Sequence, residues 1–179
     1  GVSDQEFDRL IVACGKGQMK KLKQFLKKRK GQINRSDSSG RTLLYVACFN
    51  CQLKAAKLLL KQHGIQVNQA NQNGMTALVA ASLEGHTKVV RLLLSKSDID
   101  INKAKDTGAT ALHVASQNNH IVVVELLLSK SEIDINRVKK NGATSLYIAS
   151  QNGHVQIVRT LLTRDDIDVN KPMKAGCTP

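Results

Sequence analysis

Aromatic residues are scarce in this sequence, which has three phenylalanines, two tyrosines and no tryptophan among 179 residues. Alanine, leucine, isoleucine and valine must therefore fill any core, and these small side chains suit thin helices that pack closely together. Long apolar runs are also missing, because no stretch approaches the roughly 18 apolar residues of a membrane-spanning helix. We therefore expect no transmembrane segment.

Acidic residues are few relative to basic ones, with 14 of the former against 27 of the latter and a formal net charge of +13. The excess is uneven: residues 1–39 carry +6, residues 40–73 carry +4, and each of the segments 74–107, 108–141 and 142–179 carries +1. Such an asymmetry concerns partners and solubility rather than the fold. It favours partners that are themselves acidic.

The four cysteines (Cys14, Cys48, Cys51 and Cys177) are too few to form a disulfide framework for a chain of this length. This usage favours a reducing intracellular compartment, the cytoplasm, the nucleus or both. Glycine-rich phosphate loops are missing as well, since the sequence has neither a dinucleotide-binding fingerprint nor a Walker pattern. We expect no nucleotide cofactor.

A period of 34 residues is the main feature that the sequence does contain. Three residue types keep this step: glycine at Gly40, Gly74, Gly108, Gly142 and Gly176, asparagine at Asn34, Asn68, Asn102, Asn136 and Asn170, and alanine at Ala13, Ala47, Ala81, Ala115 and Ala149. A period of this size is typical of stacked supersecondary units that pack against their neighbours. The chain should therefore be an array without a single central core.

Each period predicts two short helices and an extended connector. In the first unit, Ser3 and Glu6 form a capping box ahead of apolar residues at helical spacing. A second helix should run from about Met19 to Lys30. Later helices are predicted over Thr42 to Phe49, Leu53 to Gln62, Thr76 to Leu83, Thr87 to Lys96, Thr110 to Gln117, Ile121 to Lys130, Thr144 to Gln151 and Val155 to Thr163. The repeated alanines should then form one buried column.

The repeated pattern Gly-x-Thr-x-Leu-(His/Tyr)-x-Ala-(Ser/Cys), followed by (Gly/Asn)-His, Leu-Leu-Leu and Asp-(Ile/Val)-Asn, resembles the ankyrin repeat. The resemblance covers almost the whole chain. It implies an all-α solenoid of stacked helix–turn–helix units with short β-hairpin connectors. It also implies one domain, 1–179, divided into an N-terminal capping unit (1–39), repeats at 40–73, 74–107, 108–141 and 142–175, and the start of a further repeat (176–179).

The sequence departs from the usual ankyrin pattern at one position of each repeat. The proline that the family usually carries after the threonine, where it favours the first helical turn, is replaced by Leu43, Ala77, Ala111 and Ser145. The face of the last unit should be apolar and lack a polar cap, so end-to-end self-association of the chain is also expected.

Three histidines, His86, His120 and His154, recur at one position before a second helix. Neighbouring helices pack about 10 Å apart, whereas zinc holds its ligands at about 2.0–2.1 Å. A repeated turn-stabilising histidine is therefore the better interpretation than a zinc site. His113 lies at the family's Thr-x-x-His position, where Tyr45, Val79 and Tyr147 replace it in other units, and this variation does not suit a shared catalytic role.

The remaining chemistry-bearing residues do not form a catalytic set either. Cys48 and Cys51 are a lone pair, and Cys48 occupies a column of small residues that packing explains. Cys51 replaces glycine or asparagine, which indicates a left-handed turn that would strain a cysteine. Asp100, Asp134 and Asp168 recur once per unit, too far apart to share a proton. The sequence thus predicts no enzyme, no metal site and no cofactor.

Basic side chains gather on the predicted second helices near the N-terminus: Lys20, Lys23, Lys27, Lys28, Arg29, Lys30, Lys54 and Lys57. The simpler interpretation is a solvated helix face, with the last cations favoured by the helix dipole. A row of this length also suits a polyanion, either nucleic acid or an anionic membrane lipid. The lack of exposed aromatic residues does not favour stacking on single strands.

The family resemblance implies a partner-binding surface on the concave side, at the hairpin tips and the ends of the first helices. Transferred position by position, it comprises Arg41, Phe49, Asn50, Asn73, Met75, Leu83, Glu84, Lys103, Lys105, Gln117, Asn118, Arg137, Lys139 and Lys140. Phe49, Met75 and Leu83 are apolar where solvent is expected, which indicates an interface. A partly buried contact between units is the alternative. The cations around them suggest acidic segments in the partner.

These observations give two hypotheses of different classes. The first is a non-catalytic protein–protein interaction scaffold that binds a partner, with acidic segments, on its concave surface. The second is a basic polyanion-binding module that uses the N-terminal cations for nucleic acid or anionic lipid.

Overall fold

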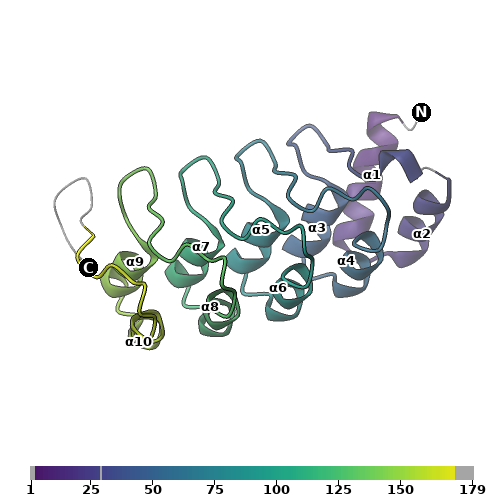
Figure 1. Cartoon of the computed structure of the whole chain (residues 1–179). Coiled ribbons are helices and arrows are strands. Elements are labelled where there is room, and N and C mark those ends of the chain that lie inside the picture. Colours follow the sequence, from purple (N-terminus) through teal and green to yellow (C-terminus); the bar gives the residue numbers. More distant parts are fainter. Residues whose placement is uncertain (1–2, 29, 172–179) are drawn as a thin grey trace.

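The computed structural model describes residues 3–28 and 30–171, apart from the side chain of Lys30. Figure 1 shows the chain as an elongated array of helices and loops. The described helices are α1 (Asp4–Gly15), α2 (Met19–Lys28), the 3-10 helix η1 (Lys30–Gln32), α3 (Leu43–Phe49), α4 (Leu53–Leu59), α5 (Ala77–Leu83), α6 (Thr87–Leu93), α7 (Ala111–Gln117), α8 (Ile121–Leu128), α9 (Ser145–Gln151) and α10 (Val155–Leu162).

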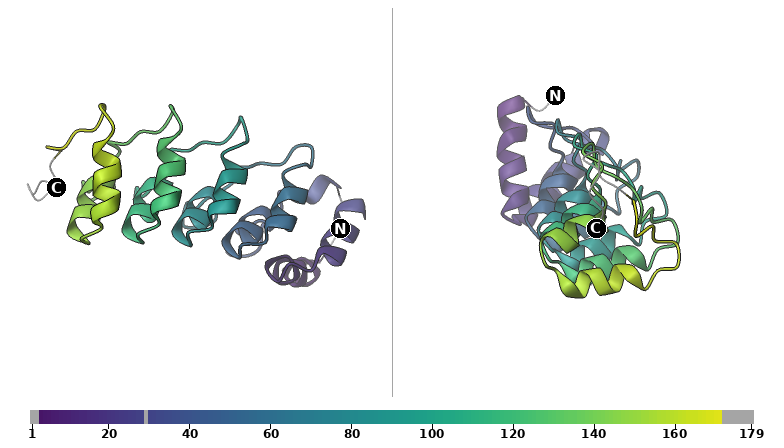
Figure 2. Two further views of the ribbon diagram at one scale, coloured as in Figure 1. Left: turned by 90° about the horizontal axis from the view of Figure 1, so that it is seen from below. Right: turned by 90° about the vertical axis from the view of Figure 1, so that its left-hand side faces the viewer.

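The α-helices form pairs that are stacked along the array. Each odd-numbered helix contacts the even-numbered helix that follows it, and each also contacts its counterpart in the neighbouring pair. The odd-numbered helices form one row, the even-numbered helices form a second row, and loops project along one edge (Figure 2). Among the described residues there are ten α-helices and no β-strand. The predicted all-α solenoid is confirmed.

Threonine side chains fix where three of the odd-numbered helices begin. The Oγ1 atoms of Thr42, Thr76 and Thr144 accept the backbone N–H three residues further on, at 3.1–3.3 Å. These helices are seven residues long, which is too short for stability alone in water. Their stability must therefore come from burial against neighbouring helices.

That burial follows the sequence period. Ala47, Ala81, Ala115 and Ala149 are all completely buried, as are Leu59, Leu93, Leu127 and Leu161 of the even-numbered helices. The predicted alanine column is confirmed. A small side chain at this position lets successive odd-numbered helices approach closely.

Asparagine side chains connect each unit to the next. The Nδ2 atom of Asn68 donates to the carbonyl of Asp98 at 2.7 Å, and its Oδ1 accepts the N–H of Asp100 at 2.9 Å. The same two bonds are made by Asn34, Asn102 and Asn136. We call these four residues the asparagine ladder. The repeated asparagine of the sequence is therefore an inter-unit hydrogen-bonding group.

The connecting loops are hairpin-shaped without forming strands. Two backbone hydrogen bonds close each of the four loops: in the loop before α5, for example, the Asn71 N–H donates to the Met75 carbonyl and the Gly74 N–H donates to the Asn71 carbonyl. The loop before α3 also has one antiparallel bridge, between Ser36 and Thr42. Neighbouring tips are also joined, because the N–H groups of Gln72, Asp106 and Lys140 donate to the carbonyls of Ser39, Asn73 and Thr107. These bonds hold the tips in a fixed order along the array.

The even-numbered helices after α2 end one to three residues earlier than predicted, for instance α4 at Leu59 and α6 at Leu93. The following N–H groups bond to the carbonyl three residues back, as Gln62 does to Leu59 and Lys96 to Leu93. This tighter turn leads into the connector. Hydrophobic spacing alone does not distinguish it from a further helical turn.

Candidate binding surface

The residues predicted from the resemblance lie on the loop tips and at the C-terminal ends of the odd-numbered helices. We use the term inner surface for residues 38–41, 72–75, 103–109 and 137–143 together with the last residue and the two following residues of α3, α5, α7 and α9. The two parts lie beside each other. One hollow of about 220 Å³, for example, is lined by Lys139 of a loop, Gln117 of α7, and Tyr147 and Gln151 of α9.

The apolar part of this surface centres on an aromatic pair. The rings of Tyr45 and Phe49 are stacked, with centroids 6.1 Å apart and an interplanar angle of 6°. Tyr45 is buried and its hydroxyl contacts the Met75 sulfur at 3.4 Å, whereas 37% of Phe49 is exposed. Met75 and Leu83 are half-buried against the core. Phe49 is thus the solvent-facing member of a cluster that Tyr45 and Met75 support from below.

The repeated histidines bond to this surface from behind. The Nε2 atoms of His86, His120 and His154 lie 2.9–3.1 Å from the carbonyl oxygens of Phe49, Leu83 and Gln117, respectively. Each histidine therefore caps the end of the odd-numbered helix in the preceding unit. This is the structural role expected from the sequence, and it fixes the backbone of three predicted surface residues.

The polar residues at the helix ends are partly engaged within the chain. Asn50 and Asn118 follow α3 and α7, and their Nδ2 atoms donate to the carbonyls of Val46 and Val114 at 2.9 and 2.8 Å. Both residues remain exposed, as does Glu84 after α5. The amides of Asn50 and Asn118 thus bond to their own helices while both residues remain exposed to solvent.

The cations of the inner surface are not equally available. Arg41 pairs with Asp37 at 2.7 Å, and the Asp37 side chain is almost fully buried. Burial alone would raise the pKa of Asp37, but hydrogen bonds from Arg41 and from the Ser39 N–H outweigh it and lower the pKa. Arg41 is therefore committed to its own loop.

Five other cations are available to a partner, as the sequence predicted. Arg137 and Lys140 are exposed, Lys103, Lys105 and Lys139 are half-buried, and no ion pair with a described residue is found for any of the five. Asn73, at the tip of the preceding loop, is also exposed, and its carbonyl accepts the Asp106 N–H. The loop side of the inner surface thus keeps an excess of positive charge.

Tyr147 is a surface residue that the sequence did not single out. It is half-buried and lines the hollow beside Lys139. Its position within the period is the one that Tyr45 occupies in α3. The signal was present in the sequence, because an aromatic residue at this position recurs only in these two units.

The alternative basic patch lies on the even-numbered helices. Lys20, Lys23, Lys27, Lys28, Lys54 and Lys57 are all exposed, whereas Arg29 and the side chain of Lys30 lie outside the described residues. Within the described part of the chain, none of the six lysines forms an ion pair. The six lysines lie on α2 and α4, and Lys28 also lines a groove between α1 and α2.

The cysteine pair is not arranged for redox or metal chemistry. Cys48 is completely buried and burial raises its pKa, whereas Cys51 is exposed. Cys51 has a φ of 57°, as its replacement of glycine predicts. Residues 3–28 and 30–171 contain no group of three His, Cys, Asp or Glu side chains placed to hold a metal ion. In the same ranges no helix has the length and apolar character needed to cross a membrane.

A family model described as ankyrin repeats, in three copies, matches residues 10–105 and 97–173 of this chain. The chain belongs to the ankyrin repeat family. Ankyrin repeats in general act as protein–protein interaction modules. No curated protein matches the chain. The family assignment agrees with the stacked helix pairs, the threonine caps and the asparagine ladder of this array.

Proposed function

We propose that this array of ankyrin repeats is a non-catalytic scaffold that binds an acidic segment of a protein partner across its inner surface. The observation that carries the proposal is the exposed Phe49 ring stacked on Tyr45. An aromatic side chain that is already held in place loses little conformational freedom on binding. Aromatic residues, phenylalanine included, are also enriched in the buried cores of protein–protein interfaces.

The charges around this anchor support an acidic partner. Arg137, Lys140 and the half-buried lysines of the loops give the tips a positive potential. Such rim charges mainly speed association, whereas a buried apolar anchor mainly slows dissociation. The hollow beside Tyr147 offers a second place for a partner side chain. It lies between α7 and α9, further along the array than the anchor on α3.

A test begins with partners captured from the source cells and measured as purified pairs by surface plasmon resonance. Phe49→Ala should raise the dissociation rate about tenfold or more, as loss of an interface anchor does. Lys103→Glu with Arg137→Glu should lower the association rate and weaken its dependence on salt. Val122→Ala, at an exposed valine of α8, is the matched control and should change neither rate.

The polyanion alternative predicts the opposite ranking. In that case, charge reversal at Lys20, Lys23, Lys27, Lys28 and Arg29 abolishes binding and Phe49→Ala has little effect. If the partner stays bound to Phe49→Ala but is lost on reversing these cations, the inner-surface proposal is wrong.

A further inference from the structure

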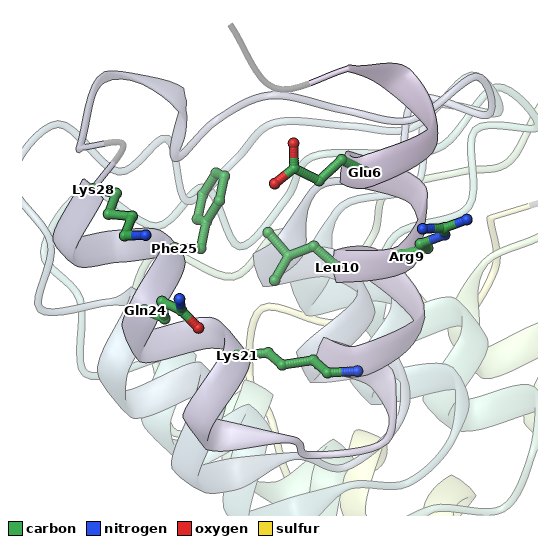
Figure 3. A pocket seen from close by; sticks show the side chains of 7 residues that line it. All are labelled: Glu6, Arg9, Leu10, Lys21, Gln24, Phe25 and Lys28. Carbon is green, nitrogen blue, oxygen red and sulfur yellow. The ribbon is translucent and has the colours of Figure 1, made fainter.

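A groove between α1 and α2 lies away from the inner surface. It has a volume of about 370 Å³ and is lined by Glu6, Arg9, Leu10, Lys21, Gln24, Phe25 and Lys28. In Figure 3, α1 and α2 are nearest the viewer and the other helices lie behind them. Leu10 and Phe25 occupy the space between the two helices, and Lys21 reaches across from α2 towards α1. A second hollow of about 450 Å³ shares Arg9 and Lys21 and adds Val12.

Phe25 of the groove and Val12 of the adjoining hollow continue columns that are buried in every later unit. We call Leu10, Val12 and Phe25 together the apolar floor. Val12 is 55% exposed, whereas its counterparts Val46, Ala80, Val114 and Ile148 are at most 6% exposed. Phe25 is half-buried, whereas its counterparts on α4, α6, α8 and α10 are fully buried leucines. In those units the preceding pair of helices covers the column, as α1 and α2 cover α3 and α4. The groove thus presents a surface that elsewhere in this array receives helices.

The rim of the groove is cationic. Arg9, Lys21 and Lys28 are exposed, and none of them forms an ion pair with a described residue. Glu6 is the one carboxylate that lines the groove. The adjoining hollow that contains Val12 is lined by one carboxylate, Asp8, and by a further cation, Lys16. An occupant with acidic groups beside an apolar stripe would neutralise these charges and cover the floor together.

We infer that the groove between α1 and α2 is a second docking site, separate from the inner surface, for an amphipathic helix with acidic flanks in a partner protein. The apolar stripe of that helix packs on Leu10, Val12 and Phe25, and its flanking Asp or Glu side chains pair with Arg9, Lys21 and Lys28. Helix packing brings two axes to about 8–10 Å, and we expect the docked helix to approach α1 and α2 to this distance.

Two other occupants fit less well. A small polyphosphate would place its charges over an apolar floor and beside Glu6. A lipid surface needs several apolar side chains that protrude, but Leu10 is buried and Phe25 is half-buried at the bottom of the groove, which leaves Val12 as the one largely exposed apolar side chain of the three. An acidic amphipathic helix would both pair with the cations of the rim and bury the apolar floor.

The test uses the full chain and a display library of random peptides of about 20 residues, long enough to form a helix. Selected peptides should carry leucine, isoleucine or phenylalanine at helical spacing, with Asp and Glu on the flanks. Their affinities, measured by fluorescence anisotropy, should fall at least about tenfold on the triple variant R9E/K21E/K28E, as loss of several charge pairs predicts. The matched triple variant K61E/K88E/R91E reverses three exposed cations outside the groove and should stay within about twofold.

A second pair of variants tests the floor. Val12→Asp should weaken the selected peptides about tenfold, whereas Val122→Asp, at the similarly exposed valine of α8, should not. Circular dichroism melts establish that each variant remains folded. Phe49→Ala should leave these peptides bound, so the outcome is independent of the inner-surface proposal.

Several results would overturn the inference. These are selection of peptides without acidic residues, equal binding to the groove and control variants, and failure to enrich any sequence. It would also be overturned if groove variants dissociated a self-associated form of the chain in sedimentation experiments, because the occupant would then be a second copy. Binding of phosphatidylserine vesicles that is lost in the groove variants, without peptide enrichment, would assign the groove to a membrane instead.

Discussion

The Nε2 atom of His113 lies 3.2 Å from the carbonyl oxygen of Ala143, in the loop before α9. On the other side of the ring, Nδ1 accepts the Thr110 N–H at 3.3 Å and lies 2.8 Å from the Thr110 hydroxyl. Because Nδ1 accepts the N–H, the ring proton is on Nε2 and is donated to Ala143. His113 therefore caps its own helix and binds the next unit while neutral.

This geometry predicts acid sensitivity at one residue. Burial, and to a lesser extent the positive charges of Lys139 and Arg137, lower the pKa of His113 from 6.5 to about 4, although hydrogen bonding to the backbone of Ala143 and Arg137 opposes the shift. Above pH 6.5 the ring is neutral in both the folded and the unfolded chain, so its ionisation does not change the free energy of unfolding. Between pH 6.5 and 4 the unfolded chain takes up a proton that the folded chain does not, so stability falls as pH falls, by roughly 3 kcal/mol in total.

His113→Val, which copies Val79 at the same position, should remove this contribution. Urea unfolding at pH 7 and pH 5 would show a stability loss about 2 kcal/mol larger in the wild type than in the variant. The other histidines are common to both proteins and cancel. An identical pH dependence in the two proteins would show that His113 is not the acid-sensitive group.

A leucine column predicts unequal effects of the same truncation. Leu128 is 8% exposed, whereas Leu162, one period later, is 48% exposed. Leu128→Ala should cost about 2–5 kcal/mol, as buried leucine truncations do, and Leu162→Ala should cost less than about 1 kcal/mol. Chemical denaturation of both variants measures the difference, and equal losses would contradict it.

The left-handed backbone at Cys51 predicts a stabilising substitution. Cys51 has a φ of 57°, and Gly17, Gly85 and Gly153 occupy the same position with φ values of 67° to 69°. Cys51→Gly should raise the free energy of unfolding by about 1 kcal/mol, because glycine has no Cβ to strain. Cys51→Ala keeps the Cβ and is the control, for which we expect little change. A gain in both variants would point to the sulfur rather than to the backbone.

Two buried serines predict another gain. The hydroxyls of Ser82 and Ser116 are fully buried and have no hydrogen-bond partner, and the same column holds Cys14 and Cys48 in the first two units. Ser116→Ala should stabilise the chain by about 1 kcal/mol, the usual cost of an unpaired buried hydroxyl. Ser150→Ala, at the exposed member of the column, should change the thermal midpoint little. Destabilisation by Ser116→Ala would mean that the hydroxyl is satisfied.

The fold could be predicted from the sequence because each stacking contact repeats with the period. The alanine column, the threonine caps and the strained Cys51 all follow from comparing one position in successive units. The candidate site could be predicted less fully, since exposure depends on neighbours that differ between units. Phe49, Met75 and Leu83 look alike in sequence, yet Tyr45 and the core half-cover two of them.

The groove between α1 and α2 could not be predicted, although its residues are plain in the sequence. Val12 and Phe25 occupy columns that are apolar throughout the chain, so their pattern indicates burial. Their exposure arises from their place at one end of the described helices rather than from their residue types. A periodic pattern predicts which residues contact the neighbouring unit. It does not show in which unit the equivalent residues are exposed because no helix packs on them.

The asparagine ladder makes the array modular in length. The side chain of each asparagine donates a hydrogen bond to the carbonyl 30 residues further along the chain and accepts one from the N–H 32 residues further along. Every inner unit therefore supplies these backbone groups to the unit before it and uses the same groups of the unit after it. Removing or duplicating a complete 34-residue segment would rejoin equivalent groups and leave no bond unmade. Removing 33 residues would shift the amide away from both of its partners. A length change by whole periods is thus compatible with the fold, and the ladder keeps the register through such changes.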